Sequence, residues 1–158
     1  LPAVESSYLA FLRSMSALYH QDYNEMAEIL QEEIRNNPQD PIAYNALGFS
    51  LIEIDPKNAK VALPFISKAN LMAPGRDFIQ DSLAWAYYML GDLDRAYKYI
   101  VQAYHQNKDP EIIAHYIVIL DAIGERQKAE DLYHRFNLFF GNSDAKEVLI
   151  ENVEWINE

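Results

Sequence analysis

The stretch from Asp81 to Ala103, DSLAWAYYMLGDLDRAYKYIVQA, carries two apolar patterns on either side of a turn signal. In its first half, apolar side chains recur at the spacing of one helix face, at Leu83, Ala84, Tyr87 and Leu90. After Gly91-Asp92 the same spacing resumes at Ala96, Ile100 and Ala103. The pattern predicts two amphipathic helices joined by a tight turn. Neither helix can bury its apolar stripe alone, so the pair needs neighbours of the same kind.

The rest of the chain repeats this unit. Gly124 lies 33 residues after Gly91, and Ala129 follows it much as Ala96 follows Gly91. Earlier in the chain, YNALGFSL at 44–51 has the pattern of the first helix. A helix–turn–helix period of about 34 residues is typical of the tetratricopeptide repeat, and the chain resembles that family over nearly its whole length.

The resemblance implies an all-α, right-handed superhelical solenoid with nine helices, no strands and a single domain. Four repeats are expected, at about 6–38, 41–74, 77–108 and 110–140, followed by a capping helix at about 144–156. Small residues are expected where the two helices of a repeat cross closely, at Gly48, Ala84, Ala96 and Ala129.

The first repeat departs from the family pattern. Its turn is Gln21-Asp22-Tyr23, and counting back from Asp22 places Arg13 where the family usually has Leu. Either the register slips by one residue, or this is an atypical capping repeat, which is common at the ends of solenoids.

Composition excludes several classes of partner. The formal net charge is −11, so binding to nucleic acid or to anionic membrane surfaces is not expected, and a neutral or basic peptide is the better electrostatic match. No apolar run reaches the ~18 residues that a membrane span needs. There is no Cys, so disulfide and thiolate chemistry are absent. Because the sequence begins at Leu1 without Met, we expect a processed or trimmed piece of a longer protein.

No pattern predicts catalysis. The four His residues are not spaced three or four apart, no HExxH motif is present, and the glycines that recur with the repeats stand singly instead of forming a phosphate loop. We therefore predict no catalytic residue, no metal site, no cofactor and no enzymatic activity.

In tetratricopeptide stacks, the first helix of each repeat lines a concave groove. The resemblance assigns to this groove the candidate partner-binding residues Asn45, Phe49, Ile52, Phe78, Asp81, Trp85, Tyr88 and Val118. Further groove positions are Tyr8, Phe11, Met15, Leu18, Ile42, Glu111, Ala114 and Asp121.

The residues of this groove predict its partner. Chaperone-binding members of the family grip a peptide carboxylate with Lys, Arg and Asn, but here only Asn45 remains and no groove position is basic. An aromatic, mildly acidic groove suits an apolar or amphipathic segment that carries some Lys or Arg. An exposed Trp85 would be an interface hot spot.

Other interpretations stay open. The aromatic stripe could be core, and the final helix or the N-terminal tail could fold into the groove and fill it. The chain could instead be a homodimerising module, or a regulatory domain of a larger enzyme or secretion protein.

A narrower resemblance covers roughly residues 41–136. The segments AYNALGFSL, FIQDSLAWAYYMLGDLDRAYKYI and DPEIIAHYIVILDAIGERQKAEDLY follow in the order seen in the C-terminal repeats of bacterial outer-membrane-lipoprotein tetratricopeptide proteins. This resemblance implies a periplasmic adaptor for processing proteases, cell-wall hydrolases or envelope-assembly factors, with the cytoplasm as the alternative location. Such proteins need a lipidated Cys, so any membrane tether would lie in sequence not present here.

Overall fold

The computed structural model describes the backbone of residues 3–157 and the side chains of residues 7–157. Within this range the chain forms no strand, which confirms the all-helical expectation. The α-helices are α1 (Ala3–Tyr19), α2 (Tyr23–Asn36), α3 (Pro41–Ile54), α4 (Ala59–Met72), α5 (Asp77–Met89), α6 (Leu93–Gln106), α7 (Pro110–Ala122), α8 (Arg126–Phe140) and α9 (Asp144–Asn152). Two short 3-10 helices follow α3 and α9, namely η1 (Pro56–Asn58) and η2 (Glu154–Asn157). Among these helices, none combines the length and the apolar character that crossing a bilayer requires.

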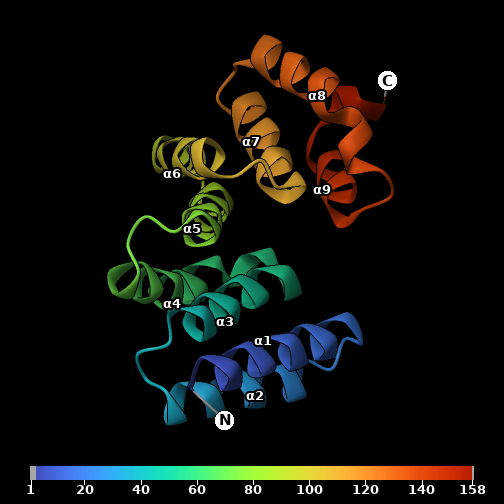
Figure 1. Ribbon diagram of the computed structural model, residues 1–158. Coiled ribbons are helices and arrows are strands. Elements are labelled where there is room, and N and C mark those ends of the chain that lie inside the picture. Colours follow the sequence, from blue (N-terminus) through green and yellow to red (C-terminus); the bar gives the residue numbers. More distant parts are fainter. Residues whose placement is uncertain (1–2, 158) are drawn as a thin grey trace.

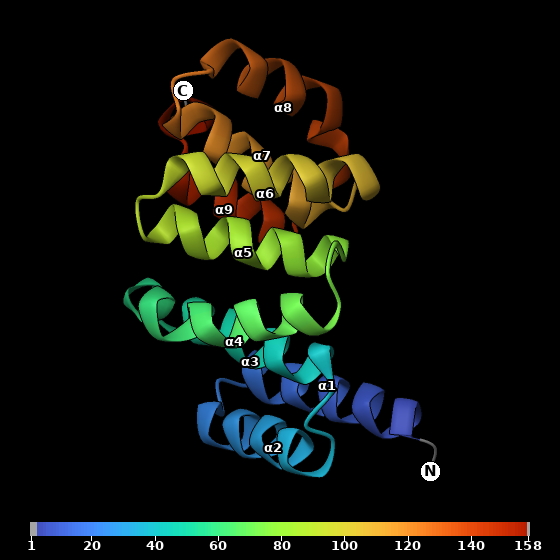
Figure 2. The same ribbon diagram turned by 90° about the vertical axis from the view of Figure 1, so that its left-hand side faces the viewer.

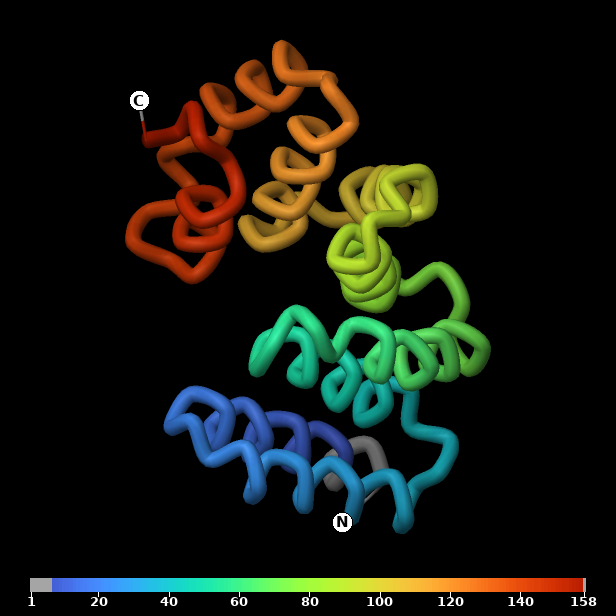
Figure 3. Tube along the Cα trace, turned by 180° about the vertical axis from the view of Figure 1, so that it is seen from behind, coloured from blue at the N-terminus to red at the C-terminus, as the bar shows by residue number. Residues whose placement is uncertain are grey.

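The helices form antiparallel pairs that stack into a curved solenoid (Figures 1 and 2). The pairs run in order from α1 and α2 at one end to α7 and α8 at the other, and α9 then turns back against α7. The first helices of successive pairs touch one another, α1 with α3, α3 with α5 and α5 with α7. They form one layer of the solenoid, and the trace seen from behind shows the same order of pairs (Figure 3).

Local sequence explains where the helices begin and turn. Asp40 and Asp109 each precede a Pro at the first helical position, and their side chains accept hydrogen bonds from the N–H groups of Ile42 and Glu111. The turn after the first helix of a pair has a positive φ at Gly91, as it has at Gln21. The recurring turn geometry accounts for the repeated Gly signal in the sequence.

The small residues allow the helices to approach closely, as the sequence predicts. Gly48 is buried on α3, and a Cβ atom added there would lie 2.5 Å from Cγ1 of Ile66 on α4. Ala84, Ala96 and Ala129 are completely buried in the other pairs. A larger side chain at these positions would push the paired helices apart.

The first repeat keeps the register counted from its turn. Ser14 and Ala17 are buried on α1, as Ala84 and Tyr87 are at the equivalent positions of α5. Arg13 is exposed because this repeat is first in the described chain and no earlier helix pair covers it. This arrangement agrees with the register counted from Asp22 and not with a slip of one residue.

The end of the chain differs from the prediction of one helix over residues 144–156. Helix α9 ends at Asn152, where the Asn152 side-chain amide donates to the Val148 carbonyl at 2.8 Å. Val153 is extended and buried, and η2 follows it. The break lets the last residues turn towards α7.

The Gly48 contact predicts that a substitution which usually stabilises a helix destabilises this protein. Gly to Ala within a helix normally stabilises by roughly 0.5–1 kcal/mol. We expect Gly48→Ala to destabilise the protein by about 1–3 kcal/mol instead, because the new methyl group overlaps Ile66. Urea unfolding measures the difference. A gain in stability would show that α3 and α4 do not cross this closely.

Candidate functional site

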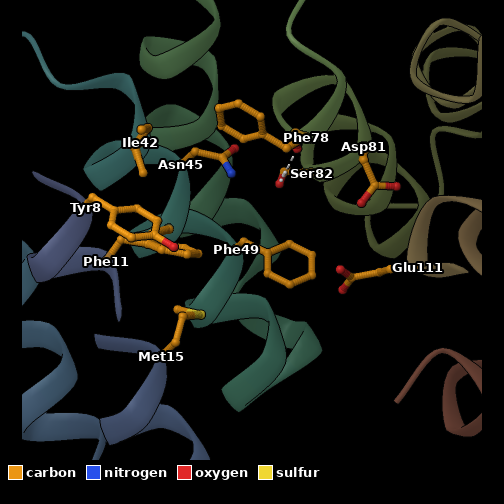
Figure 4. A pocket seen from close by; sticks show the side chains of 11 residues that line it. Tyr8, Phe11, Met15, Ile42, Asn45, Phe49, Phe78, Asp81, Ser82 and Glu111 are labelled. Atoms are coloured by element: carbon orange, nitrogen blue, oxygen red, sulfur yellow. Dashed lines mark hydrogen bonds between the residues drawn. The ribbon is translucent and has the colours of Figure 1, made fainter. Parts of the chain in front are cut away.

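The open part of the concave layer contains a cavity of about 350 Å³. It lies between α1, α3, α5 and the first turn of α7, and most of its lining is apolar. Figure 4 shows aromatic side chains from three helices around it, with two carboxylates on the far side of the Phe49 ring. The lining residues are Tyr8, Phe11, Met15, Ile42, Asn45, Ala46, Phe49, Phe78, Asp81, Ser82 and Glu111.

The structure brings together half of the eight candidate binding residues at this cavity. Those that line it are Asn45, Phe49, Phe78 and Asp81. Those that do not line it are Ile52, Trp85, Tyr88 and Val118. Groove positions of the first repeat also contribute, because Tyr8, Phe11 and Met15 face the same space.

Trp85 does not present an exposed face, contrary to expectation. Only 3% of it is exposed. Its ring stacks on His115 of α7 with centroids 4.1 Å apart, and Tyr88 stacks against it at 4.9 Å. The contact between α5 and α7 therefore encloses Trp85, and Ile52 and Val118 are buried as well.

The C-terminal segment α9–η2 covers the concave face of the last repeat. Elsewhere in the solenoid, the helix that follows a pair packs mainly on its second helix, whereas α9 packs mainly on α7, the first helix of its pair. Nε1 of Trp155 donates a hydrogen bond of 2.8 Å to Oδ1 of Asp121, a predicted groove residue. Of the alternatives left open by the sequence, the filled groove applies to this repeat.

At the acidic end of the cavity, Asp81 holds His115 in place. Oδ1 of Asp81 lies 2.8 Å from Nδ1 of His115, whose side chain is 1% exposed. Burial lowers the pKa of His115, but the charge and hydrogen bond of Asp81, with Glu111 and Glu53, raise it above its ordinary value. The His115 ring is therefore easier to protonate here than a free histidine, although its Nε2 atom is buried without a partner.

The other carboxyl groups at this end are shifted towards their neutral forms. The Glu111 side chain is accessible from the cavity, but the protein around it limits its hydration and raises its pKa to about 7. Asp81 and Glu53 add to this rise, while His115 opposes it. Glu53 is an exposed residue of α3 that does not line the cavity, and nearby protein raises its pKa in the same way. Loss of hydration is the main cause of both shifts, and the neighbouring acids add to it.

Asn45 adds an unused polar group to the apolar wall. The residue is 8% exposed, and its Oδ1 atom accepts no hydrogen bond although it is buried. Leaving such an atom unpaired costs roughly 1–3 kcal/mol. Because Asn45 lines the cavity, a bound group could supply the missing donor.

His115 is the member of this cluster that sequence reasoning missed. Its signal was its distance of 34 residues from Asp81, one repeat length, which places both residues at the same level of adjacent first helices. A polar residue in the apolar stretch IIAHYIVIL is a second signal.

The described side chains offer binding chemistry and no metal centre. Within residues 7–157 no group of three or more His, Asp or Glu side chains is arranged to hold a metal ion. The cavity provides apolar surface and an acidic end, and the Asn45 amide oxygen lies buried in its wall without a donor.

The burial of Trp85 predicts its role in stability. We expect Trp85→Ala to lower the free energy of unfolding by about 3–5 kcal/mol, because it leaves a cavity beneath His115. Trp155→Ala, at the half-buried end of the chain, is the matched control and should cost less. A loss below ~1 kcal/mol for Trp85→Ala in urea unfolding would mean that its ring is not core.

The comparisons with known proteins agree with this architecture. No family model matches the chain. A TPR repeat-containing protein of Pseudomonas aeruginosa, PA4667, is 33% identical over 111 residues, which make up 70% of this chain and 19% of the relative. The chain thus spans about a fifth of the length of that relative.

Two solved structures share the fold. TTC0263, a thermophilic TPR protein of Thermus thermophilus, has a TM-score of 0.74 at 16% identity, over 94% of this chain and 80% of that one. A mutant of the O-GlcNAc transferase of Thermobaculum terrenum has a TM-score of 0.72 at 16% identity, over 86% of this chain and 27% of that one. These likenesses show that the chain has the fold of a tetratricopeptide-repeat solenoid, and the sequence similarity to PA4667 supports that family.

Proposed function

We propose that the chain is a non-catalytic scaffold that binds an apolar or amphipathic segment of a partner protein in the open part of its groove. The observation that carries this proposal is the cavity walled by Phe11, Phe49 and Phe78, which come from three successive repeats. The O-GlcNAc transferase shows that this fold also occurs within an enzyme. The fold alone therefore does not exclude catalysis, and the absence of catalysis is part of our proposal.

The cavity has the physical properties of a docking site. Aromatic side chains on a rigid layer of helices supply large apolar contact area at low entropic cost. The free amide oxygen of Asn45 gives an incoming backbone N–H a hydrogen bond that the unbound protein lacks. Because α9–η2 covers most of the last repeat, the partner segment occupies the first three repeats and the first turn of α7.

Selection from a phage-displayed library of random dodecapeptides tests the proposal. We expect selected peptides to bind the wild type, and Phe49→Ala and Ile42→Ala each to weaken binding about tenfold or more, because apolar contact in the cavity is lost. Ile42 is partly exposed, so its variant keeps the fold intact.

The matched control is Tyr19→Ala, which removes an exposed aromatic ring that does not line the cavity. We expect the control to bind the peptides as tightly as the wild type does. Peptides that also bind Phe49→Ala and Ile42→Ala as tightly as the wild type would contradict the proposal.

A second candidate function is self-association. Leu138 and Phe139 lie side by side near the end of α8 and are 90% and 68% exposed, which favours an apolar contact with another chain. Under this proposal, sedimentation velocity shows a dimer that Phe139→Glu dissociates. A monomer at all concentrations contradicts it.

We also propose that the scaffold acts in the bacterial envelope, in protein assembly or processing. The support is the similarity of residues 41–136 to the repeats of outer-membrane-lipoprotein tetratricopeptide proteins. Fractionation of cells that produce the full-length protein tests this location, and recovery in the cytoplasm alone contradicts it.

A further inference from the structure

The acidic end of the cavity is built from two helices, and the basic group beside it, His115, is already paired with Asp81. Asp81 on α5 and Glu111 on α7 both line the cavity, and their carboxylates lie beyond the Phe49 ring (Figure 4). No Lys or Arg is among the described residues that line it. The Glu111 carboxylate makes no hydrogen bond or ion pair with any described residue, although the residue's own N–H is capped by Asp109.

At the opposite end of α7, another acidic groove residue receives a hydrogen bond from the chain itself. Asp121 is the last groove residue of this helix, and the chain's own Trp155 inserts there and donates a hydrogen bond to its carboxylate. Apolar residues of the same segment, Leu149 and Val153, are buried around this contact. The covered half of the groove thus combines apolar anchors with one donor to an acidic residue, while in the open half the Glu111 carboxylate has no donor.

We propose that Asp81 and Glu111 bind a Lys or Arg side chain of the partner segment, whose apolar residues occupy the adjoining cavity between Phe49 and Phe78. This inference rests on the proposed function and names the chemistry of the segment. The unpartnered amide of Asn45, buried and facing the same cavity, fixes the backbone next to this cation.

The charges around Glu111 explain why a cation is needed. Asp81 of α5, Glu53 of α3 and Asp109 before α7 are the acids that face it, and His115 of α7 is the basic group. Even with His115 protonated, Asp81, Glu111 and Glu53 leave net negative charge when Glu111 is ionised. A bound ammonium or guanidinium group restores the balance in a partly desolvated site, where water screens charge less than in bulk.

The same charges couple binding to pH. The pKa of Glu111 is raised to about 7 in the free protein. A cation beside it favours the ionised form, so binding lowers this pKa and releases a proton. Affinity therefore rises between pH 6 and pH 8, by up to about tenfold.

Substitution in a selected groove-binding dodecapeptide tests the inference. The probes are that peptide and versions in which each Lys or Arg is replaced by norleucine, which keeps the alkyl chain and removes the charge. We expect one replacement to weaken binding to the wild type about tenfold or more, and to have less than about a twofold effect on Glu111→Gln. Isothermal titration calorimetry at pH 6 and pH 8 measures both effects.

The matched control is Glu25→Gln, which removes the same charge from an exposed position on α2. We expect it to keep the full preference for the basic residue and the rise in affinity with pH, whereas Glu111→Gln loses most of both. Circular dichroism melts verify that both variants fold.

The outcomes separate the two proposals. Peptides that lose affinity with Phe49→Ala, but show no preference for Lys or Arg over norleucine, overturn this inference and leave the scaffold function standing. Equal losses of that preference in Glu111→Gln and Glu25→Gln also overturn it, because the effect would then come from net charge. Peptides insensitive to Phe49→Ala contradict the function itself.

Discussion

The contact of α9–η2 with α7 decides what the concave surface can do. Leu149 and Val153 are buried in it, and Trp155 reaches Asp121. A helix of nine residues is too short to be stable alone in water, so this packing is what holds α9 in its helical form. Without it, the buried face of α7 would be open and the groove would extend over every repeat.

The open part of the groove differs in chemistry from the part that is covered. Trp85 on α5 and Val118 on α7 are buried and do not line the cavity. Under the cavity, the Asp81–His115 pair fixes one wall. A buried ion pair adds little net stability on average, so its more important effect is to position the Asp81 carboxylate and the ring that covers Trp85.

Much of the fold follows from the sequence because it depends on local rules. The period of about 34 residues, the Asp40-Pro41 cap and the small residue Gly48 each report a contact within one repeat. The groove positions of the first three repeats follow from the same period, which is why Phe49 and Asp81 were placed on the surface that holds the cavity.

The remaining features of the fold and of the site depend on contacts between repeats, which no local pattern encodes. The curvature of the solenoid decides whether Trp85 faces the groove or is enclosed by His115, and helical spacing is the same in both cases. The final segment has an amphipathic pattern that predicts a buried face but not the helix that buries it, and its break at Val153 follows from docking against α7.

Amide hydrogen exchange of α9, compared with that of α7, tests most directly whether the chain covers its own last repeat. The account predicts that the amides of residues 148–153 are protected and exchange through the same opening as those of α7, because both share one buried interface. Exchange of α9 within seconds, while α7 stays protected, would show that the segment is not docked and that the last repeat is open.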